Sequence, residues 1–395
     1  MDSHNEARIS ALPSPVEHAD LLAYRQEFPL VQQKTYLNSC SIGALSLRSL
    51  HGLPDFLLWN QWDRWLDAIE RARRQFAMLI GAAPHEIALA VNVSSALSSL
   101  ASALDYSKRS RVVMSDLEFP TMQYQWLVKA RLGVQCHIVK SPDRVSVPPE
   151  LFAAACDERT ALLATSRVYY TSGAIQDIAL LAEIAHRQGA YLLVDDYQAS
   201  GQIPLDVRAC DVDLLVSGSL KWLLGGPGVA FIYVREELLP VLSPTIAGWF
   251  AHAEQFQFQE QTFAFRADAR RFEMGTPALA GVYAALGGMQ IVEEIGVRAI
   301  CERTRFLVSD LLARIERQGW RAHVAGEPGQ RSAIVMLAIA HAEEVAGELL
   351  ARNIVADSYT GLLRLAPYFY NTIEENALVI RALVEILARR SEHTV

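Results

Sequence analysis

Short apolar runs alternate with segments of helical periodicity along the chain from about residue 68 onward. Strand-like runs separated by amphipathic helices are typical of βαβ units, which build a mostly parallel sheet. The pattern therefore predicts one large α/β domain. Its seven strands are expected at residues 87–91, 111–115, 136–139, 161–166, 191–195, 213–217 and 229–234.

The pattern changes beyond about residue 280. Long amphipathic helices such as residues 297–319 dominate there, together with one clear strand at 333–339, and this mixture predicts a smaller α+β domain. In the large domain, the helix predicted at 178–189 ends in Gly189, a residue type common just after helix C-termini. We divide the chain into an N-terminal arm (1–35), a large domain (36–280) and a small C-terminal domain (281–395).

Charge and composition narrow the class of protein. The chain has 395 residues, 51% of them apolar, and a formal net charge of -8 with no block of lysine and arginine. We therefore expect neither nucleic acid nor a membrane as a partner, because both are bound through clustered positive charge or long apolar segments. The five cysteines are scattered singly, and the N-terminus has no apolar signal segment. These features favour a soluble enzyme of the cytoplasm.

Lysine is rare in this chain, and one lysine stands apart. Of the five lysines, Lys221 alone lies between two apolar, strand-like runs, and the glycine-rich turn 225–228 follows it. Burying a lysine is unfavourable unless its amine is paired or neutral, and enzymes use such amines as nucleophiles. The position of Lys221 thus indicates a catalytic amine.

Two polar residues mark the end of the preceding predicted strand. Asp195 ends the run 191–195, and Gln198 follows three residues later. Because reactive groups in open α/β sheets gather at the carboxyl ends of strands, we expect Asp195 and Lys221 to lie close together. The histidines show no metal-ligand spacing, and the chain contains neither a nucleophile elbow nor a nucleotide-binding glycine loop. We therefore expect no bound metal.

The order Asp195, Gln198, Lys221 resembles the core of fold-type I pyridoxal-phosphate enzymes of the aminotransferase class V family, in the branch of kynureninase and cysteine desulfurase. This resemblance extends over most of the chain. It implies the fold of type I PLP-dependent transferases and pyridoxal 5'-phosphate as the cofactor. In the family pattern, Asp195 keeps the ring nitrogen protonated, Gln198 hydrogen bonds to the ring hydroxyl oxygen, and Lys221 binds the aldehyde and then moves protons at the substrate.

Two further segments resemble the parts of the family that hold the cofactor. The segment VNVSSALSSL (91–100) is similar to the phosphate loop, where Ser94, Ser95 and backbone amides opening a helix bind the phosphate. The segment EFPTMQY (118–124) is similar to the stretch whose aromatic residue stacks on the pyridine ring, which implies that Phe119 does so here.

The resemblance also concerns the residues around the lysine and a second subunit. It implies phosphate contacts from Ser217, Ser219 or both, whereas Leu220 stands where relatives carry histidine or tyrosine. The segment RFEMGTP is similar to one whose Gly-Thr pair reaches the phosphate site of the neighbouring subunit, which implies Thr276. A homodimer with shared active sites is therefore expected.

The substrate site is expected from the same resemblance. The segment 36–46 is similar to a substrate-binding loop, and the pair Tyr169 and Tyr170 together with Trp249 resembles the kynureninase pattern. Arg364 lies in a segment whose arginine binds the substrate α-carboxylate, a task that suits a planar guanidinium. We therefore expect Tyr170, Trp249 and Arg364 to bind a small amino acid.

The reaction itself is left open between alternatives. The family acts on amino acids through an external aldimine, from which β-cleavage, transamination and epimerisation all remain possible. The aromatic residues favour a lyase that cleaves a C–S or C–C bond beyond Cα, and the alternative is a class V aminotransferase or an epimerase. Desulfuration through a protein persulfide is not expected, because residues 355–367 contain no cysteine.

Overall fold

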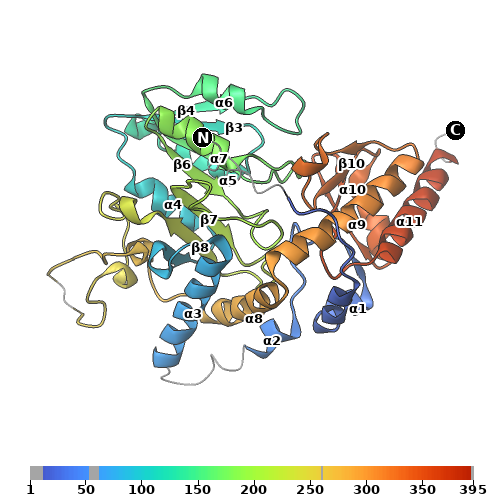
Figure 1. Cartoon of the computed structure of the whole chain (residues 1–395), viewed down its shortest axis with the longest axis horizontal. Coiled ribbons are helices and arrows are strands. Elements are labelled where there is room, and N and C mark those ends of the chain that lie inside the picture. The colour runs from blue at the N-terminus through green and yellow to red at the C-terminus, as the bar shows by residue number, and fades with distance from the viewer. Residues whose placement is uncertain (1–11, 53–61, 259–260, 393–395) are drawn as a thin grey trace, which may run out of the picture.

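A seven-stranded sheet forms the centre of the computed structural model, which describes residues 12–52, 62–258 and 261–392 (Figure 1). The strands follow the order β2-β8-β7-β6-β5-β3-β4, and β8 is antiparallel to both of its neighbours in a sheet that is otherwise parallel. All seven predicted strands are confirmed, with ends within one residue of the prediction: β2 (Ile87–Ala90), β3 (Arg111–Ser115), β4 (Gln135–Val139), β5 (Thr160–Ser166), β6 (Tyr191–Asp195), β7 (Leu214–Gly218) and β8 (Ala230–Val234).

Helices cover both faces of this sheet, and β5, β7 and β8 are buried along their whole length. Strands covered on both sides have near-continuous apolar runs, which is why these strands were recognisable in the sequence. One face packs against α3 (Trp62–Ile80), α6 (Pro149–Ala155), α7 (Ile178–Arg187) and α8 (Leu279–Ile295). The other face packs against α4 (Val93–Ala103) and α5 (Pro120–Leu127).

The predicted helix at 178–189 is confirmed as α7, and its ends follow local chemistry. The Asp177 side chain accepts a hydrogen bond from the Leu180 amide at the helix start. Gly189 has a φ of 67° just beyond the helix, a left-handed conformation that costs glycine nothing.

A smaller antiparallel sheet lies in the C-terminal part, in the order β12-β13-β10-β9. Its strands are β9 (Ala322–His323), β10 (Val335–Leu337), β12 (Asp357–Tyr359) and β13 (Leu362–Leu365), and it packs with α9 (Val297–Arg317), α10 (Ala342–Ala351) and α11 (Ile373–Glu392) around an apolar core. The long helix predicted at 297–319 is thus confirmed as α9. The strand predicted at 333–339 is shorter in the structure, as β10.

The described part of the N-terminal segment packs against the C-terminal part, as Figure 1 shows for α1 (Pro29–Gln33). Arg25 donates hydrogen bonds to both carboxylate oxygens of Glu375, and Phe28 is fully buried against Tyr370. The short strand β1 (Thr35–Tyr36) pairs with β11 (Ile354–Val355), and α2 (Leu47–His51) follows it. The three-part division of the chain stays a prediction, and residues 1–11 of its first part lie outside the described residues. Among the helices described, none combines the length and apolar character needed to cross a membrane.

Candidate functional site

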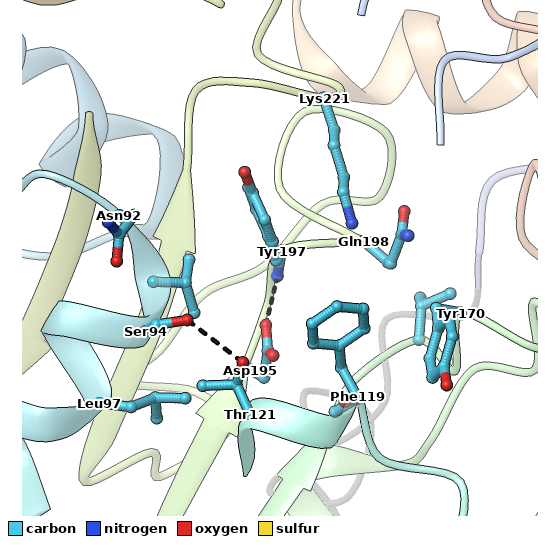
Figure 2. A pocket seen from close by; sticks show the side chains of 13 residues that line it. Asn92, Ser94, Leu97, Phe119, Thr121, Tyr170, Asp195, Tyr197, Gln198 and Lys221 are labelled. Atoms are coloured by element: carbon cyan, nitrogen blue, oxygen red, sulfur yellow. Dashed lines mark hydrogen bonds between the residues drawn. The ribbon is translucent and has the colours of Figure 1, made fainter. Parts of the chain in front are cut away.

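Segments that follow the carboxyl ends of five parallel strands meet in one cavity at the edge of the large sheet. Lys221 follows β7, Asp195 ends β6, and Phe119 follows β3, as the topology predicts for a mostly parallel sheet. Figure 2 shows Lys221 and Asp195 entering this cavity from opposite sides in that view. Six residues predicted for the site line the cavity: Ser94, Phe119, Tyr170, Asp195, Gln198 and Lys221.

Asp195 and Lys221 face each other across Tyr197. Asp195 is 8% exposed, and its carboxylate accepts a hydrogen bond of 2.9 Å from the Tyr197 amide. The Lys221 Nζ atom lies 4.3 Å from the centre of the Tyr197 ring. The lysine therefore ends inside the cavity and not in bulk solvent.

The surroundings shift both ionisable groups toward neutrality. Burial lowers the pKa of Lys221 to about 8, although the Asp195 carboxylate opposes this shift. Burial raises the pKa of Asp195 to about 6, against the Tyr197 amide and the charge of Lys221. At neutral pH Asp195 is mainly ionised, and Lys221 loses its proton close to physiological pH. An amine with such a pKa is available as a nucleophile and as a proton carrier.

Gln198 is held in a fixed orientation beside Lys221. Its Nε2 atom donates to the carbonyl oxygen of Cys40 (3.0 Å), and its Oε1 atom accepts from Trp222 Nε1 (3.0 Å). One Nε2 hydrogen remains available, since an amide nitrogen carries two.

The N-terminus of α4 forms one end of the cavity. Asn92 caps this helix by accepting a hydrogen bond from the Ser95 amide (2.8 Å), and the Ser94 hydroxyl lies 3.2 Å from that of Thr121. Backbone amides at a helix start favour an anion, and Asn92, Ser94 and Thr121 all line the cavity there. The Ser95 side chain is not part of the lining.

An aromatic wall bounds the side of the cavity near Phe119, which is 45% exposed. The Phe119 and Tyr170 rings meet edge to face at 5.2 Å, and Tyr170 meets Tyr359 in the same way at 5.0 Å. Behind this wall, the buried Glu118 carboxylate accepts hydrogen bonds from Ser115, Thr165 and Ser166. This network fixes the backbone that presents Phe119.

Arg364 lies at the end of the aromatic wall and is 5% exposed. Its Nη2 atom donates to Asp357 (2.6 Å) and to the Ser41 hydroxyl (2.5 Å), and its guanidinium carbon lies 5.5 Å from the centre of the Tyr359 ring. Its buried Nε atom has no hydrogen-bond partner among the described residues. Its Nη1 atom also donates to the Tyr170 carbonyl oxygen (3.4 Å). Arg364 is thus rigidly held beside the aromatic wall, and it is not part of the cavity lining.

The predicted substrate-binding loop packs directly on the lysine segment. The Gly43 amide donates to the carbonyl oxygen of Leu220 (2.8 Å). A Cβ atom at position 43 would lie 1.8 Å from the Lys221 carbonyl oxygen, so this close approach requires glycine.

The structure does not bring two of the predicted phosphate contacts into the cavity. Ser217 and Ser219 are fully buried: Ser217 lies in β7, which is covered on both faces, and Ser219 directly follows this strand. The Ser219 hydroxyl donates to the carbonyl oxygens of Gly226 and Val229, and that of Ser217 lies 3.5 Å from the Asp196 carbonyl oxygen. Neither side chain is part of the cavity lining.

Trp249 and Thr276 also lie apart from Lys221 within one chain. Trp249 lines a different cavity together with His252 and Phe258, and Thr276 is exposed to solvent. Neither residue lines the Lys221 cavity.

Sequence reasoning missed several residues of the site, and Tyr197 is the main one. Tyr197 lies between Asp195 and Gln198 in the sequence, so these two predicted site residues indicated that Tyr197 could also lie at the site. Thr121 and Asp357 also lie in segments that the sequence analysis singled out, but their positions at the site depend on how α5 and the β12–β13 hairpin pack. The described residues contain no group of three or more histidine, cysteine or acidic side chains that could hold a metal ion.

Comparison with known proteins gives a consistent result. The family described as Aminotransferase class-V matches residues 61–375. The chain is 37% identical to the uncharacterized aminotransferase YcbU of Bacillus subtilis (strain 168), covering 94% of this chain and 98% of that protein. It is 28% identical to a kynureninase of Geobacillus thermodenitrificans, covering 93% of this chain and 91% of the relative.

Solved structures share the fold at lower identity. The apo structure of a cysteine desulfurase from Thermococcus onnurineus NA1 superposes with a TM-score of 0.85 at 20% identity, covering 95% of this chain and 99% of that one. The cystine C–S lyase C-DES, in complex with its reaction product cysteine persulfide, superposes with a TM-score of 0.82 at 19% identity. This match covers 90% of this chain and 98% of that one. These likenesses confirm the predicted fold class.

Proposed function

Because the chain belongs to the class V aminotransferase family and is a pyridoxal-phosphate enzyme, we propose that it is a lyase that cleaves a C–S or C–C bond beyond Cα of a small amino acid. The observation that carries the proposal is the joint position of Lys221 and Asp195 in one cavity, beside a helix N-terminus and an aromatic ring.

The residues present fit the cofactor. Pyridoxal phosphate needs an amine for its aldehyde, an acid for its ring nitrogen, an aromatic face and an anion site for its phosphate. Lys221, Asp195 and Phe119 supply the first three, and the start of α4 with Ser94 supplies the fourth. When bound, the cofactor accepts the electron pair left at Cα of the substrate.

Each residue has a task in this proposal. The Asp195 carboxylate holds a proton at the ring nitrogen, which its negative charge stabilises. Gln198 donates its remaining amide hydrogen to the ring hydroxyl oxygen. Lys221 removes the proton at Cα and returns a proton after cleavage, a role for which its pKa of about 8 is suited.

Substrate binding is assigned to the aromatic wall and the arginine beside it. Arg364 binds the α-carboxylate through its guanidinium group, which Asp357 keeps in place. Tyr170 and Tyr359 provide an apolar surface for the substituent beyond Cβ, which supports a lyase. Cys40, which lies nearby, is fully buried, and burial raises the pKa of its thiol, so it is unsuited to carry a persulfide.

A class V aminotransferase is the second candidate, favoured by the 37% identity to a protein named as an aminotransferase. Single-turnover reactions with amino acids and cysteine conjugates separate the two. A lyase releases pyruvate or alanine and retains the aldehyde form of the cofactor. Stoichiometric recovery of pyridoxamine phosphate, reversed by a 2-oxo acid, would instead mean transamination. Inversion at Cα without either product would mean an epimerase.

We also propose that the enzyme works in the cytoplasm as a homodimer with shared sites. The five free cysteines support a reducing compartment. The positions of Trp249 and Thr276 away from the Lys221 cavity support contributions from a second subunit. Mixing inactive Lys221→Ala protein with an inactive Thr276→Ala variant should restore part of the activity. Full activity of a monomer would contradict the shared site.

A further inference from the structure

The phosphate end of the cavity lacks donors from the strand that precedes Lys221. The α4 side offers backbone amides and Ser94, whereas on the β7 side the hydroxyls of Ser217 and Ser219 are directed to main-chain carbonyls. Leu220 has no polar side-chain atom at all. A doubly charged phosphate enclosed by protein needs hydrogen bonds from more than one side.

Tyr197 is a polar side chain beside the β7 side of the cavity, where these donors are missing. It follows β6, lines the cavity together with Asn92 and Ser94, and in Figure 2 its ring lies between Asn92 and Lys221. Its hydroxyl has no hydrogen-bond partner among the described residues and is not enclosed by protein atoms. Burial of the ring and the charge of Asp195 raise the pKa of Tyr197 to about 12, so the hydroxyl keeps its proton and acts as a donor.

The end of the neighbouring strand β7 leaves space for the Tyr197 ring. A Cβ atom at Gly218, the last residue of β7, would lie 2.8 Å from Cε2 and 3.3 Å from Cζ of Tyr197. Any side chain at position 218 would therefore force the ring to move. The glycine at the end of β7 and the tyrosine that follows β6 therefore fit together sterically.

We propose that the Tyr197 hydroxyl donates a hydrogen bond to the phosphate of the cofactor, supplying the contact that Ser217, Ser219 and Leu220 do not. This inference rests on the proposed function, since it requires pyridoxal phosphate in this cavity. It makes Tyr197 a cofactor-binding residue, with Gly218 as the residue that leaves room for it.

The experiment measures the dissociation constants of pyridoxal phosphate and of pyridoxal, which lacks the phosphate, for cofactor-free enzyme. Tyr197→Phe keeps the ring and removes only the hydroxyl. We expect it to weaken binding of pyridoxal phosphate about 10-fold to 100-fold, the size expected for a hydrogen bond to a charged group, and to leave pyridoxal binding unchanged. Tyr124→Phe, at an exposed tyrosine on α5, is the matched control and should change neither constant.

Inorganic phosphate gives a readout that is independent of the aldehyde chemistry. Phosphate should raise the melting temperature of the cofactor-free enzyme, and it should do so less in Tyr197→Phe. Equal weakening of both ligands would assign Tyr197 to the ring or to Lys221 and overturn the proposal, as would unchanged affinity for both. If the unsubstituted enzyme binds neither ligand, the proposed function itself fails.

Gly218→Ala tests whether the glycine at position 218 is needed to leave room for the Tyr197 ring. The added methyl group displaces the Tyr197 ring, so we expect weaker pyridoxal phosphate binding in the otherwise unsubstituted chain. In the Tyr197→Phe background the same substitution should cause little further loss, because the hydroxyl is already gone. Additive losses would contradict the link between the two positions.

Discussion

Two neighbouring carboxylates at the end of β6 have opposite surroundings. Asp196 is fully buried and is bound by Arg167 through Nε (2.5 Å) and Nη2 (3.1 Å), with a further hydrogen bond from Ser200. Asp195 is almost as buried, yet its carboxylate accepts only the Tyr197 amide among the described residues and faces the Lys221 cavity.

The difference separates a structural acid from a functional one. A buried charge that is fully paired contributes to a fixed arrangement, and here the Arg167–Asp196 pair also holds the carbonyl oxygens of Ile203 and Pro204. A buried charge with few partners is unfavourable unless a ligand completes it. Asp195 is therefore the acid that can pair with a positively charged group of a ligand, whereas Asp196 is already paired with Arg167.

The largest effect is expected for a substitution in the cavity that Asp195 faces. Lys221→Ala removes the amine that binds the cofactor and moves the substrate proton, so we expect activity to fall at least about 1000-fold. Turnover is measured on the substrate found in the single-turnover screen, with circular dichroism to verify folding. Activity near that of the unsubstituted enzyme would remove the lysine from the mechanism.

The next largest effect tests the structural role of Asp196. Asp196→Ala leaves the Arg167 guanidinium buried without its carboxylate, and the free energy of unfolding should fall by about 3–5 kcal/mol. Urea denaturation measures this loss. A change below about 1 kcal/mol would mean that the pair does not stabilise the end of β6.

Replacing Asp195 should instead lower the activity strongly without destabilising the fold. Asp195→Asn should reduce activity at least about 100-fold, because an amide does not stabilise a proton on the ring nitrogen. The free energy of unfolding should not fall, since burial disfavours the ionised carboxylate, as its raised pKa shows, and the amide carries no charge. Severe destabilisation with little loss of activity per folded molecule would reverse the assignment of the two acids.

The smallest effect concerns the stability of the cofactor-free enzyme and its pH dependence. Folding lowers the pKa of Lys221 from 10.5 to about 8, so the unfolded chain binds more protons between these values and stability rises with pH across that window. Below pH 8 the half-buried ammonium opposes folding. Lys221→Met should therefore stabilise the cofactor-free enzyme at pH 7 by about 1–2 kcal/mol, with the gain fading as pH approaches 10.5. Lys140→Met, at an exposed lysine, should show no such gain.

The sequence predicted those parts of the molecule that depend on local pattern. The seven strands followed from apolar runs, and Asp195 and Lys221 followed from their places after two of those strands. Their meeting in one cavity is a consequence of parallel topology, which brings strand ends to one edge.

The remaining parts depend on tertiary packing, which a pattern does not encode. The close approach of the Tyr197 ring to Gly218 depends on the direction of a side chain that follows β6, and the pairing of Asp357 with Arg364 arises from an unpredicted hairpin. The serine at position 217 was expected at the phosphate, but the strand that carries it is covered on both faces, which directs its side chain into the protein.

The central claim is that Lys221, opposite Asp195, is the lysine that binds the cofactor. Borohydride reduction of the holoenzyme, followed by proteolysis and mass spectrometry of the peptides, tests it most directly. The account predicts cofactor attached to the peptide that contains Lys221 and loss of this label in Lys221→Ala. Label on Lys34, Lys108, Lys129 or Lys140, or no label on any lysine, would contradict it.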